Sequence, residues 1–377
     1  MKIDNYLSDD PTLGITIDGS SIQLPAQFET RQLRYYSATT KTAETIRHNL
    51  EWAQTGEGAP EFQFVYLMLP TRCNQKCAGC FVGQDKGRLP KQLSGPFFSK
   101  QELDQIFFFA REHGAQAIVY SGGGELFTWR GALGFVEQAK KHGLNMMIFT
   151  NGTLLDRDKL QHLNQLGVAL TVSLRDTTEH LHNTVVGFTG FRRAIVTIQT
   201  AMDLGMHEYG RLAVEIPVNK NNEGRIINDL LPVLRACRIV PMIEEYITTL
   251  TSEEENKWCH TFPQAREFFK KLAYRDAELG TKWQPEYGTR MLAQPKCRRP
   301  LYSFAIFPNG EVVDCPTNTV SYGNLREQNL YDIVYSDRFR KAVLSHELCP
   351  CSVFYTESSQ QIPQVLPKHL QRMKGSE

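Results

Sequence analysis

The sequence has no apolar run near the ~20 residues that a membrane-spanning helix needs, and neither sign of charge dominates. Its 42 Lys and Arg residues nearly balance 41 Asp and Glu residues, which gives a formal net charge of +1 at pH 7. The charge therefore gives no reason to expect nucleic acid or an anionic membrane as a partner. The first residues, MKIDNYLSDDPTLG, are polar and acidic, unlike a secretory signal. We expect a cytoplasmic protein that binds neither nucleic acid nor membrane.

The composition is not that of a disordered chain, because 41% of the 377 residues are hydrophobic and 22% are charged. Nine residues are cysteines. In a reducing compartment disulfides are rare, so clustered cysteines more often hold metal or take part in catalysis. Seven of the nine fall into an early and a late group, while Cys237 and Cys259 stand apart.

Strand-like and helix-like patterns alternate from residue 61 onward. The helix pattern of 99–114, for example, opens with a Ser cap followed three residues later by Glu. Six such units in series predict a parallel sheet, and right-handed crossovers curl it into a partial barrel or leave an open doubly wound sheet. The expected strands are 62–70, 115–123, 144–153, 168–175, 211–219 and 239–247.

Polar and glycine-rich segments follow these expected strands. In barrels of parallel strands the site is built from the loops at the carboxyl ends of the strands. We therefore predict a site on this rim. Its segments are the cysteine loop, Ser121–Glu125, Thr150–Gly152, Ser173–Asp176 and Asn219–Asn222.

The early cysteines form a single loop, TRCNQKCAGC, with Cys73, Cys77 and Cys80 separated by three and then two residues. Thiolates are the usual ligands of iron–sulfur clusters. Three of them leave one iron of a [4Fe–4S] cluster open to another ligand. Structural zinc is the alternative, although zinc prefers four ligands. Three unrelated cysteines are the remaining interpretation.

The segment CNQKCAGC after the first strand, with SGGGE after the second, is similar to the radical S-adenosylmethionine superfamily. The resemblance implies an α/β fold, a partial (β/α)6 TIM-like barrel. It also implies that the open iron chelates S-adenosyl-L-methionine, and that one electron cleaves this cofactor to a 5′-deoxyadenosyl radical. A reductant such as flavodoxin or ferredoxin would supply the electron. The family usually has an aromatic residue where Gly79 stands, which implies altered packing of the adenine.

The same resemblance implies residues that hold the cofactor. Gly123 and Gly124 would let the backbone approach it closely. Glu125 would accept hydrogen bonds from the methionine ammonium group. A tight turn is the alternative for the glycines taken alone.

Further cofactor contacts are implied on the next strands. Ser173 resembles a serine that contacts the ribose or the carboxylate, and Asn219 a position near the adenosine, with turn formation as its alternative. Val186 stands where many relatives carry a carboxylate-binding arginine. Arg175 could take that role, because a guanidinium forks onto a carboxylate. A surface ion pair with Asp176 or another neighbour is the equal alternative.

On the substrate side, strand alternation places Glu244 and Tyr246 on one face of the sixth strand, and we predict that they act on the substrate. A salt bridge facing a helix is the alternative. Cys259 is a candidate hydrogen-atom donor, as in relatives that epimerise their substrates. We expect His180 and His182 to be solvated loop residues without a metal role.

The late cysteines are Cys297, Cys315, Cys349 and Cys351. Together with Gly310, which is separated from Cys315 by four residues, YGNL and a final CPC, they resemble the SPASM domain, or its shortened twitch form. This implies one auxiliary [4Fe–4S] cluster in a small C-terminal β-hairpin/helix domain. The last pair is spaced by one residue rather than two, which leaves complete ligation open, and structural zinc is the alternative.

We expect a radical enzyme of dehydrogenase or epimerase type that oxidises or epimerises a small molecule: a sugar, aminocyclitol or nucleotide-linked intermediate. The alternatives are a maturase of a ribosomal peptide and a non-catalytic iron–sulfur carrier or sensor. The expected divisions are an N-terminal extension (1–60), the barrel (61–250), a helical linker (251–296), the auxiliary cluster domain (297–355) and a tail (356–377).

Overall fold

The structure is a computed structural model. It describes residues 40–78, 80, 95–245, 259–260, 262–280, 301–316 and 321–345, together with a short hairpin of β1 (Ile15–Ile17) and β2 (Ser20–Ile22). Within these ranges, none of the helices combines the length and apolar character that crossing a bilayer requires.

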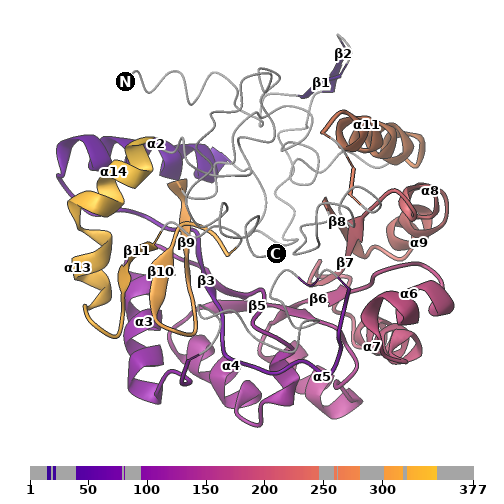
Figure 1. Ribbon diagram of the computed structural model, residues 1–377, viewed down its shortest axis with the longest axis horizontal. Helices are drawn as coiled ribbons and strands as arrows, with labels where there is room; N and C mark the ends of the chain where they lie inside the picture. The colour runs from indigo at the N-terminus through magenta and orange to yellow at the C-terminus, as the bar shows by residue number, and fades with distance from the viewer. Residues whose placement is uncertain are drawn as a thin grey trace, which may run out of the picture.

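The centre of the molecule is a nine-stranded sheet in the order β11-β10-β9-β3-β4-β5-β6-β7-β8. Strands β3 to β8 run parallel in sequence order, and the sheet curves so that its helices lie on the outside (Figure 1). This confirms the predicted partial (β/α)6 barrel. The strands are β3 (Phe64–Leu67), β4 (Ala117–Tyr120), β5 (Asn145–Thr150), β6 (Ala169–Ser173), β7 (Leu212–Val218) and β8 (Val240–Glu245).

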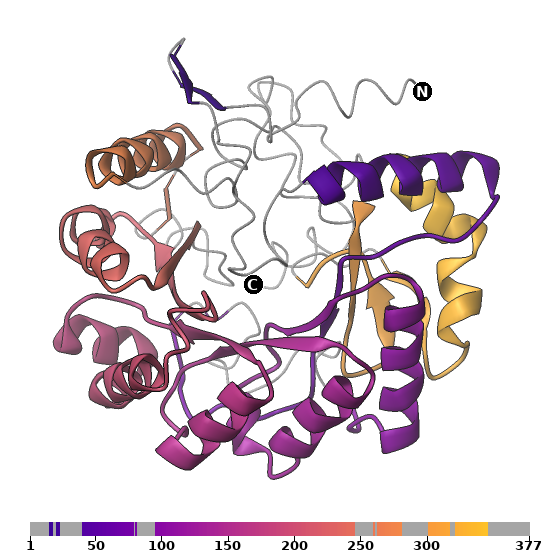
Figure 2. The same cartoon turned by 180° about the vertical axis from the view of Figure 1, so that it is seen from behind.

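The helices follow the strands around the outer side of the curve, as Figure 2 shows from behind. The predicted capping box opens the first of them: Ser99 accepts a hydrogen bond from the Glu102 amide, and the Glu102 carboxylate accepts one from the Ser99 amide. The elements are α3 (Lys100–Glu112), η3 (Leu126–Thr128), α4 (Ala132–Lys141), α5 (Arg157–Gln165), α6 (Glu179–Val186), α7 (Phe191–Asp203), α8 (Glu223–Arg225), η4 (Ile226–Leu230), α9 (Leu231–Ala236) and α11 (Phe262–Glu278).

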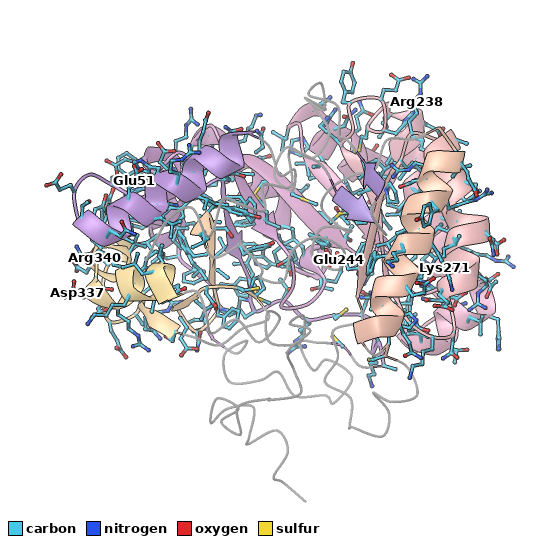
Figure 3. All side chains as sticks on the ribbon, turned by 90° about the horizontal axis from the view of Figure 1, so that it is seen from above. Glu51, Arg238, Glu244, Lys271, Asp337 and Arg340 are labelled. Carbon is cyan, nitrogen blue, oxygen red and sulfur yellow. The ribbon has the colours of Figure 1, made fainter. Side chains whose placement is uncertain are left out.

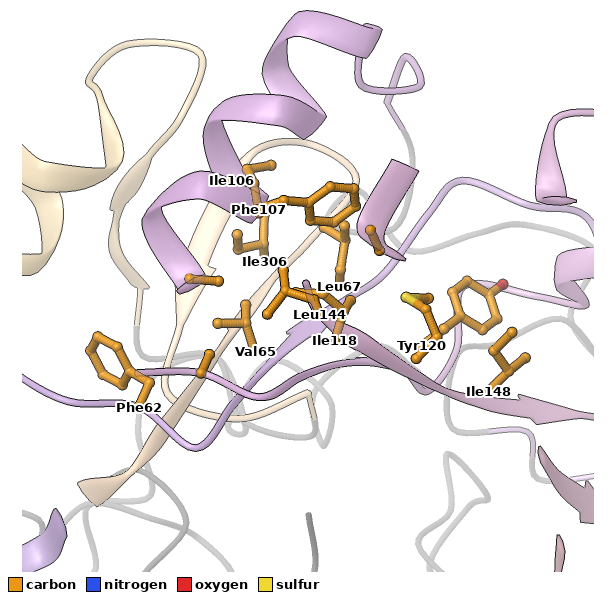
Figure 4. Packing of buried hydrophobic residues seen from close by; sticks show 14 of the residues in the cluster. Phe62, Val65, Leu67, Ile106, Phe107, Ile118, Tyr120, Leu144, Ile148 and Ile306 are labelled. Carbon is orange, nitrogen blue, oxygen red and sulfur yellow. The ribbon is translucent and has the colours of Figure 1, made fainter. Parts of the chain in front are cut away.

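Alternation along each strand divides the buried side chains between two faces. Val65, Leu67 and Ile118 face the helices and pack beneath Ile106 and Phe107 of α3 (Figure 4). The alternate residues form a second apolar cluster on the inner side of the curve, and charged side chains such as Glu51, Lys271 and Asp337 lie on the outside of the helices (Figure 3). The inner cluster includes Phe64, Tyr66, Met68, Val119, Met147, Ala213 and Met242.

The C-terminal strands extend the barrel sheet. β9 (Ser303–Ile306) pairs parallel with β3, and β10 (Glu311–Val313) and β11 (Ser321–Asn324) follow antiparallel. The predicted hairpin turn at Asn309–Gly310 is present, and Gly310 has a φ of +92°, which disfavours other residues. The expected boundary at residue 297 remains a prediction, but the strands on its two sides belong to one sheet.

An early helix and the last helices of the described chain close this edge of the sheet. α2 (Thr40–Thr55) packs on α14 (Asp337–Ser345), next to α13 (Leu330–Val334). The ring of Trp52 meets those of Tyr335 and Phe339 edge-on, with centroids 6.0 and 6.3 Å away. The expected N-terminal extension therefore contributes a helix to the main core.

Candidate functional site

The cysteine loop begins where β3 ends and carries three half-buried thiols. Burial raises the pKa of the Cys73 thiol to about 12, with smaller contributions from the thiols of Cys77 and Cys80. Burial also raises the pKa of Cys77. Crowded thiolates are unfavourable here without a compensating cation. The donor set therefore suits an iron–sulfur cluster, whose iron ions supply that positive charge.

The middle of the loop is fixed to the end of α6. The amides of Lys76 and Ala78 donate to the carbonyls of Val186 and Val185, at 3.0 and 2.8 Å. The last carbonyls of a helix have no partner within the helix, so they are available to such donors. Val186 is buried and contributes its carbonyl to this anchor.

A ring of polar side chains fixes the start of the loop. Asn151 Nδ2 donates to Asn74 Oδ1 at 2.8 Å and lies 3.9 Å from Cys73 Sγ. Asn74 Nδ2 donates to Thr153 Oγ1 at 2.8 Å, and this hydroxyl donates to Asn151 Oδ1 at 2.7 Å. The segment after β5 was predicted to lie on the rim of the barrel. In the structure it contacts the cysteine loop directly.

The glycine segment after β4 packs backbone to backbone against the root of the cysteine loop. A Cβ on Gly123 would lie 2.0 Å from the Leu69 carbonyl oxygen, and one on Gly124 2.2 Å from that of Thr71. The Glu125 amide donates to the Arg72 carbonyl at 2.9 Å. The glycines are thus required for this close approach.

Glu125 links the glycine segment to the end of β5. Its side chain is buried, and its carboxylate accepts from the Asn151 amide (2.7 Å), the Thr150 hydroxyl (2.8 Å) and the Phe127 amide (3.2 Å). Burial raises the pKa of this carboxyl. Its contact with the methionine ammonium remains a prediction.

Arg175 forms its ion pair with Glu215, at 3.2 Å between Nη1 and Oε1. Asp176 is instead bound at 2.6 Å by Arg225, so the ion pair given as the alternative for Arg175 is formed with another neighbour, Glu215. The positive charge of Arg175 lowers the pKa of the Cys77 thiol, against the larger effect of burial. The ion pair with Glu215 attaches Arg175 to the neighbouring strand β7.

Glu215 was not among the predicted site residues, although it is the one charged residue in the run LAVEIPV of β7. It shares the inner face with Ala213 and is only 8% exposed. Burial raises its pKa, Arg175 lowers it and Glu244 raises it, while Ser173 is hydrogen-bonded to its side chain. Ser173 pairs directly with Glu215 in the β6–β7 register.

Of the predicted substrate-side residues, Glu244 lies on the inner face with Met242, toward the middle of the molecule in Figure 3. Tyr246 lies outside the described residues. Cys259 is half-buried next to His260, whose Nε2 lies 3.1 Å from a carboxylate oxygen of Glu223 just beyond the β7 rim. Their roles remain predictions.

The structure shows the surroundings of the two histidines after β6 and of Asn219. His182 is not a solvated loop residue: it lies in α6, is 1% exposed, and its Nδ1 accepts from the Arg175 amide at 3.2 Å. His180, on the exposed side of the same helix, is accessible. Asn219 makes the turn contacts of its alternative, because its Oδ1 accepts from the Asn221 amide at 2.8 Å.

Only Cys315 of the late cysteines lies within the described residues. It is buried shortly after β10. Cys297, Cys349 and Cys351 fall outside the described ranges, so their ligation remains a prediction.

The chain is similar to curated proteins and to solved structures. It is 27% identical to the tungsten-containing aldehyde ferredoxin oxidoreductase cofactor-modifying protein of Pyrococcus furiosus, over 74% of this chain and 82% of that protein. It is 24% identical to the Fe-coproporphyrin III synthase of Methanosarcina barkeri, over 55% of this chain and 51% of that protein.

The structures share the fold. Streptococcus suis SuiB bound to precursor peptide SuiA has a TM-score of 0.60 and 16% identity, covering 81% of this chain and 71% of SuiB. Native anSMEcpe with bound AdoMet has a TM-score of 0.57 and 16% identity, covering 74% of this chain and 82% of that one.

Two family models match the chain. The radical SAM superfamily model covers residues 67–228, and the iron–sulfur cluster-binding SPASM model covers residues 297–354. The domains that these models describe bind the predicted cofactors: a [4Fe–4S] cluster, S-adenosyl-L-methionine and an auxiliary iron–sulfur cluster. The first match contains the loop with three thiols and the glycine segment that packs against it, and the chain therefore contains a radical SAM domain followed by a C-terminal SPASM domain.

Proposed function

We propose that Cys73, Cys77 and Cys80 hold the [4Fe–4S] cluster at which S-adenosyl-L-methionine is cleaved, and that the substrate binds on the inner face of the barrel. The observation that carries this proposal is the loop itself, which carries the three thiols and is fixed by α6, by Asn151 and by the glycine segment. When bound, the cluster supplies the single electron that converts the cofactor into the 5′-deoxyadenosyl radical.

The other rim residues hold the cofactor in this proposal. Gly123 and Gly124 present backbone to its methionine part, and Glu125 accepts from its ammonium group. Arg175 and Ser173, which both lie next to Glu215, would donate to the carboxylate or ribose of the cofactor. Asn219 stays a candidate near the adenosine through its backbone, since its side chain makes a turn contact.

We propose a small molecule as the substrate, with oxidation or epimerisation as the outcome. The named relative from Pyrococcus furiosus, a cofactor-modifying protein matched over most of its length, supports a small molecule, but the comparisons give no support to a sugar or nucleotide in particular. Glu244 and Tyr246 would contact the substrate. Cys259 would donate the hydrogen atom only if the reaction is an epimerisation, and Cys259→Ala with an unchanged product would remove it.

A peptide substrate is the second candidate. Among the structures that share the fold, SuiB is bound to its precursor peptide. Deuterated candidates of both classes can decide between them, because only the true substrate passes its label into 5′-deoxyadenosine. A flavodoxin or ferredoxin as reductant and a cytoplasmic location remain predictions.

The test uses the whole chain, purified anaerobically and reconstituted with iron and sulfide. We expect dithionite and S-adenosyl-L-methionine to yield 5′-deoxyadenosine, detected by mass spectrometry. Replacement of Cys73, Cys77 and Cys80 by Ala should abolish both this product and the iron bound at that site. Cys237→Ala is the matched control, because Cys237 packs against the outer core and should leave both unchanged. A cluster that forms without any 5′-deoxyadenosine would favour the carrier or sensor.

A further inference from the structure

Gln75 lies between the first two cysteines of the loop and is hydrogen-bonded to both. Its backbone amide donates to Cys73 Sγ at 3.4 Å. Its side-chain Oε1 accepts from Cys77 Sγ at 3.6 Å. One residue therefore connects two of the three thiols that hold the cluster in the proposed function.

The other half of the Gln75 amide is buried without a use. The residue is only 4% exposed, and its Nε2 has no hydrogen-bond partner among the described residues. A glutamine amide carries two N–H donors, and a buried donor without an acceptor costs free energy. Such a group in a folded protein calls for an explanation, and here it stands beside two predicted metal ligands.

Nε2 lies against Gly190, at the start of α7. A Cβ on Gly190 would lie 2.9 Å from Nε2, and it would also meet Phe188 Cδ1 and Thr153 Cγ2 at 3.1 and 3.2 Å. The carbonyl of Gly190 already accepts from the Ala194 amide at 3.0 Å. The described atoms on this side of the amide are therefore apolar or already paired, so the acceptor for Nε2 must be sought on the sulfur side.

Ligation of a metal changes which amide atom suits Cys77. A thiol can donate to Oε1, but a cysteine that ligates iron has lost its proton and can only accept. A half-turn of the amide exchanges Oε1 and Nε2, which have nearly the same shape. Because residue 190 has no Cβ, either atom fits beside it. The exchange gives the orphaned donor an acceptor and moves Oε1 away from the thiolate.

We infer that Gln75 is a positioning residue of the radical-generating cluster, whose Nε2 donates to the sulfur of Cys77 while its backbone amide keeps the bond to Cys73. The inference rests on the proposed cluster site. Hydrogen bonds to the sulfur atoms tune the potential of iron–sulfur clusters. A donor stabilises the reduced state more than the oxidised state, because the reduced cluster carries one more negative charge. Gln75 therefore makes one-electron reduction easier.

The experiment is a redox titration of the reconstituted whole chain, followed by electron paramagnetic resonance and carried out without S-adenosyl-L-methionine. Iron and sulfide contents are measured for every variant. Gln75→Leu removes the donor and should move the midpoint of the cluster to a more negative potential. Loss of one such hydrogen bond implies a reduced fraction roughly threefold lower at a given potential, which is about 30 mV for one electron. Gln75→Glu keeps the shape and the acceptor oxygen but has no N–H donor, so its midpoint should shift in the same direction.

The matched control is Gln138→Leu. Gln138 is also a buried glutamine, 8% exposed, but its Nε2 donates to the Lys100 carbonyl at 2.7 Å and so joins α4 to α3 rather than to the cysteine loop. The same substitution there removes a buried hydrogen bond, and its midpoint should equal that of the wild type. Wild-type or more positive midpoints in Gln75→Leu and Gln75→Glu, at full iron content, would overturn the inference.

If neither variant of Gln75 assembles the cluster, the wild type carries the test. Glutamine labelled with ¹⁵N in its side chain should give a nitrogen coupling in the pulsed paramagnetic resonance spectrum of the reduced cluster, because the donor lies against a ligand sulfur. A spectrum without this coupling would overturn the inference. A wild-type chain without any cluster would instead contradict the proposed function, which keeps the two failures distinct.

Discussion

Gly123 shows at the level of one residue why the segment after β4 must be glycine-rich. Its φ is +100°, and an added Cβ would lie 2.0 Å from the Leu69 carbonyl oxygen. Gly123→Ala should therefore push the cysteine loop out of place, lower the free energy of unfolding by about 1–3 kcal/mol and reduce the iron bound after reconstitution. Chemical denaturation and iron analysis measure both effects.

The control for this substitution is Gly134→Ala in α4. A Cβ there meets no atom within 4 Å, and Ala is favoured over Gly inside a helix by about 0.5–1 kcal/mol. That variant should keep its iron and be as stable as the wild type or slightly more so. Equal behaviour of the two alanine variants would show that the close approach at Gly123 has no consequence.

His182 should make stability depend on pH. Burial lowers its pKa from 6.5 to about 4, with the Arg175 charge adding to the shift. Between these values the unfolded chain binds the proton and the folded chain does not, so stability is full above pH 6.5 and is lost as the pH falls toward 4. The loss reaches at most about 1.4 kcal/mol per pH unit.

His182→Gln keeps an acceptor near the Arg175 amide and cannot be protonated in this range. We expect the difference in unfolding free energy between wild type and variant to change steadily from pH 7 to pH 5, as measured by urea denaturation. His180→Gln, on the exposed side of the same helix, should leave the wild-type slope intact. A wild-type slope in His182→Gln would argue against this titration.

The residues of the site differ in how far the sequence could predict them. Cys73, Cys77 and Cys80 could be predicted because their spacing within one loop reports ligand chemistry directly. Glu215 could not, because its contact with Arg175 depends on the register that sets Ser173 opposite it. The prediction that His182 lies in a solvated loop was wrong. A short helix, α6, begins at Glu179 and buries the side on which His182 lies.

At the scale of elements, the helices followed their hydrophobic periods closely, since each buries one defined face. The strands followed their continuous apolar runs, since both faces of the sheet are buried. The side-chain contacts that attach one element to its neighbour are harder to predict from the sequence. α11 rests on an apolar cluster formed with β7, β8 and η4, but also on a buried ion pair in which both oxygens of Asp276 accept from Arg235, at 2.7 and 2.6 Å. No local pattern near either residue indicates this partner.

Asp276→Asn should release part of this attachment. Removing one charge from a buried pair leaves the other charge poorly compensated, which costs about 3–5 kcal/mol. Asp276 is fully buried, so solvent cannot take the place of the carboxylate. A denaturant titration should show the loss. Glu278→Gln breaks the exposed pair with Arg275 on the same helix and should change stability by less than about 1 kcal/mol.

At the scale of the whole molecule, the C-terminal strands join the barrel through β9, which runs parallel to β3 over the register Phe64–Ser303 to Leu67–Ile306. The turn at Asn309–Gly310 could be predicted from its residues, because a hairpin is a local structure. The choice of β3 as partner could not, because it connects segments more than two hundred residues apart. The described strands of the expected C-terminal domain therefore belong to the same sheet as the barrel.

Asn49 tests whether this continuity governs unfolding. Its Nδ2 donates to the carbonyls of Glu61 (2.6 Å) and Leu301 (2.7 Å), and its Oδ1 accepts from the Glu61 amide (2.8 Å). One buried side chain therefore joins α2 to the segments that lead into β3 and β9. Asn49→Leu preserves the approximate volume and leaves these backbone groups without the side chain, at about 1–3 kcal/mol for each unsatisfied group.

If the sheet unfolds as one unit, Asn49→Leu should lower the midpoint of a single denaturation transition that tryptophan fluorescence and circular dichroism report together. Glu51→Gln, an exposed residue on the same helix, should leave the midpoint unchanged. Two separate transitions, with the barrel part keeping the wild-type midpoint, would mean that the C-terminal strands unfold on their own. A shared midpoint would instead mean that the edge formed by α2, α14 and β9 stabilises the strand that carries the cysteine loop.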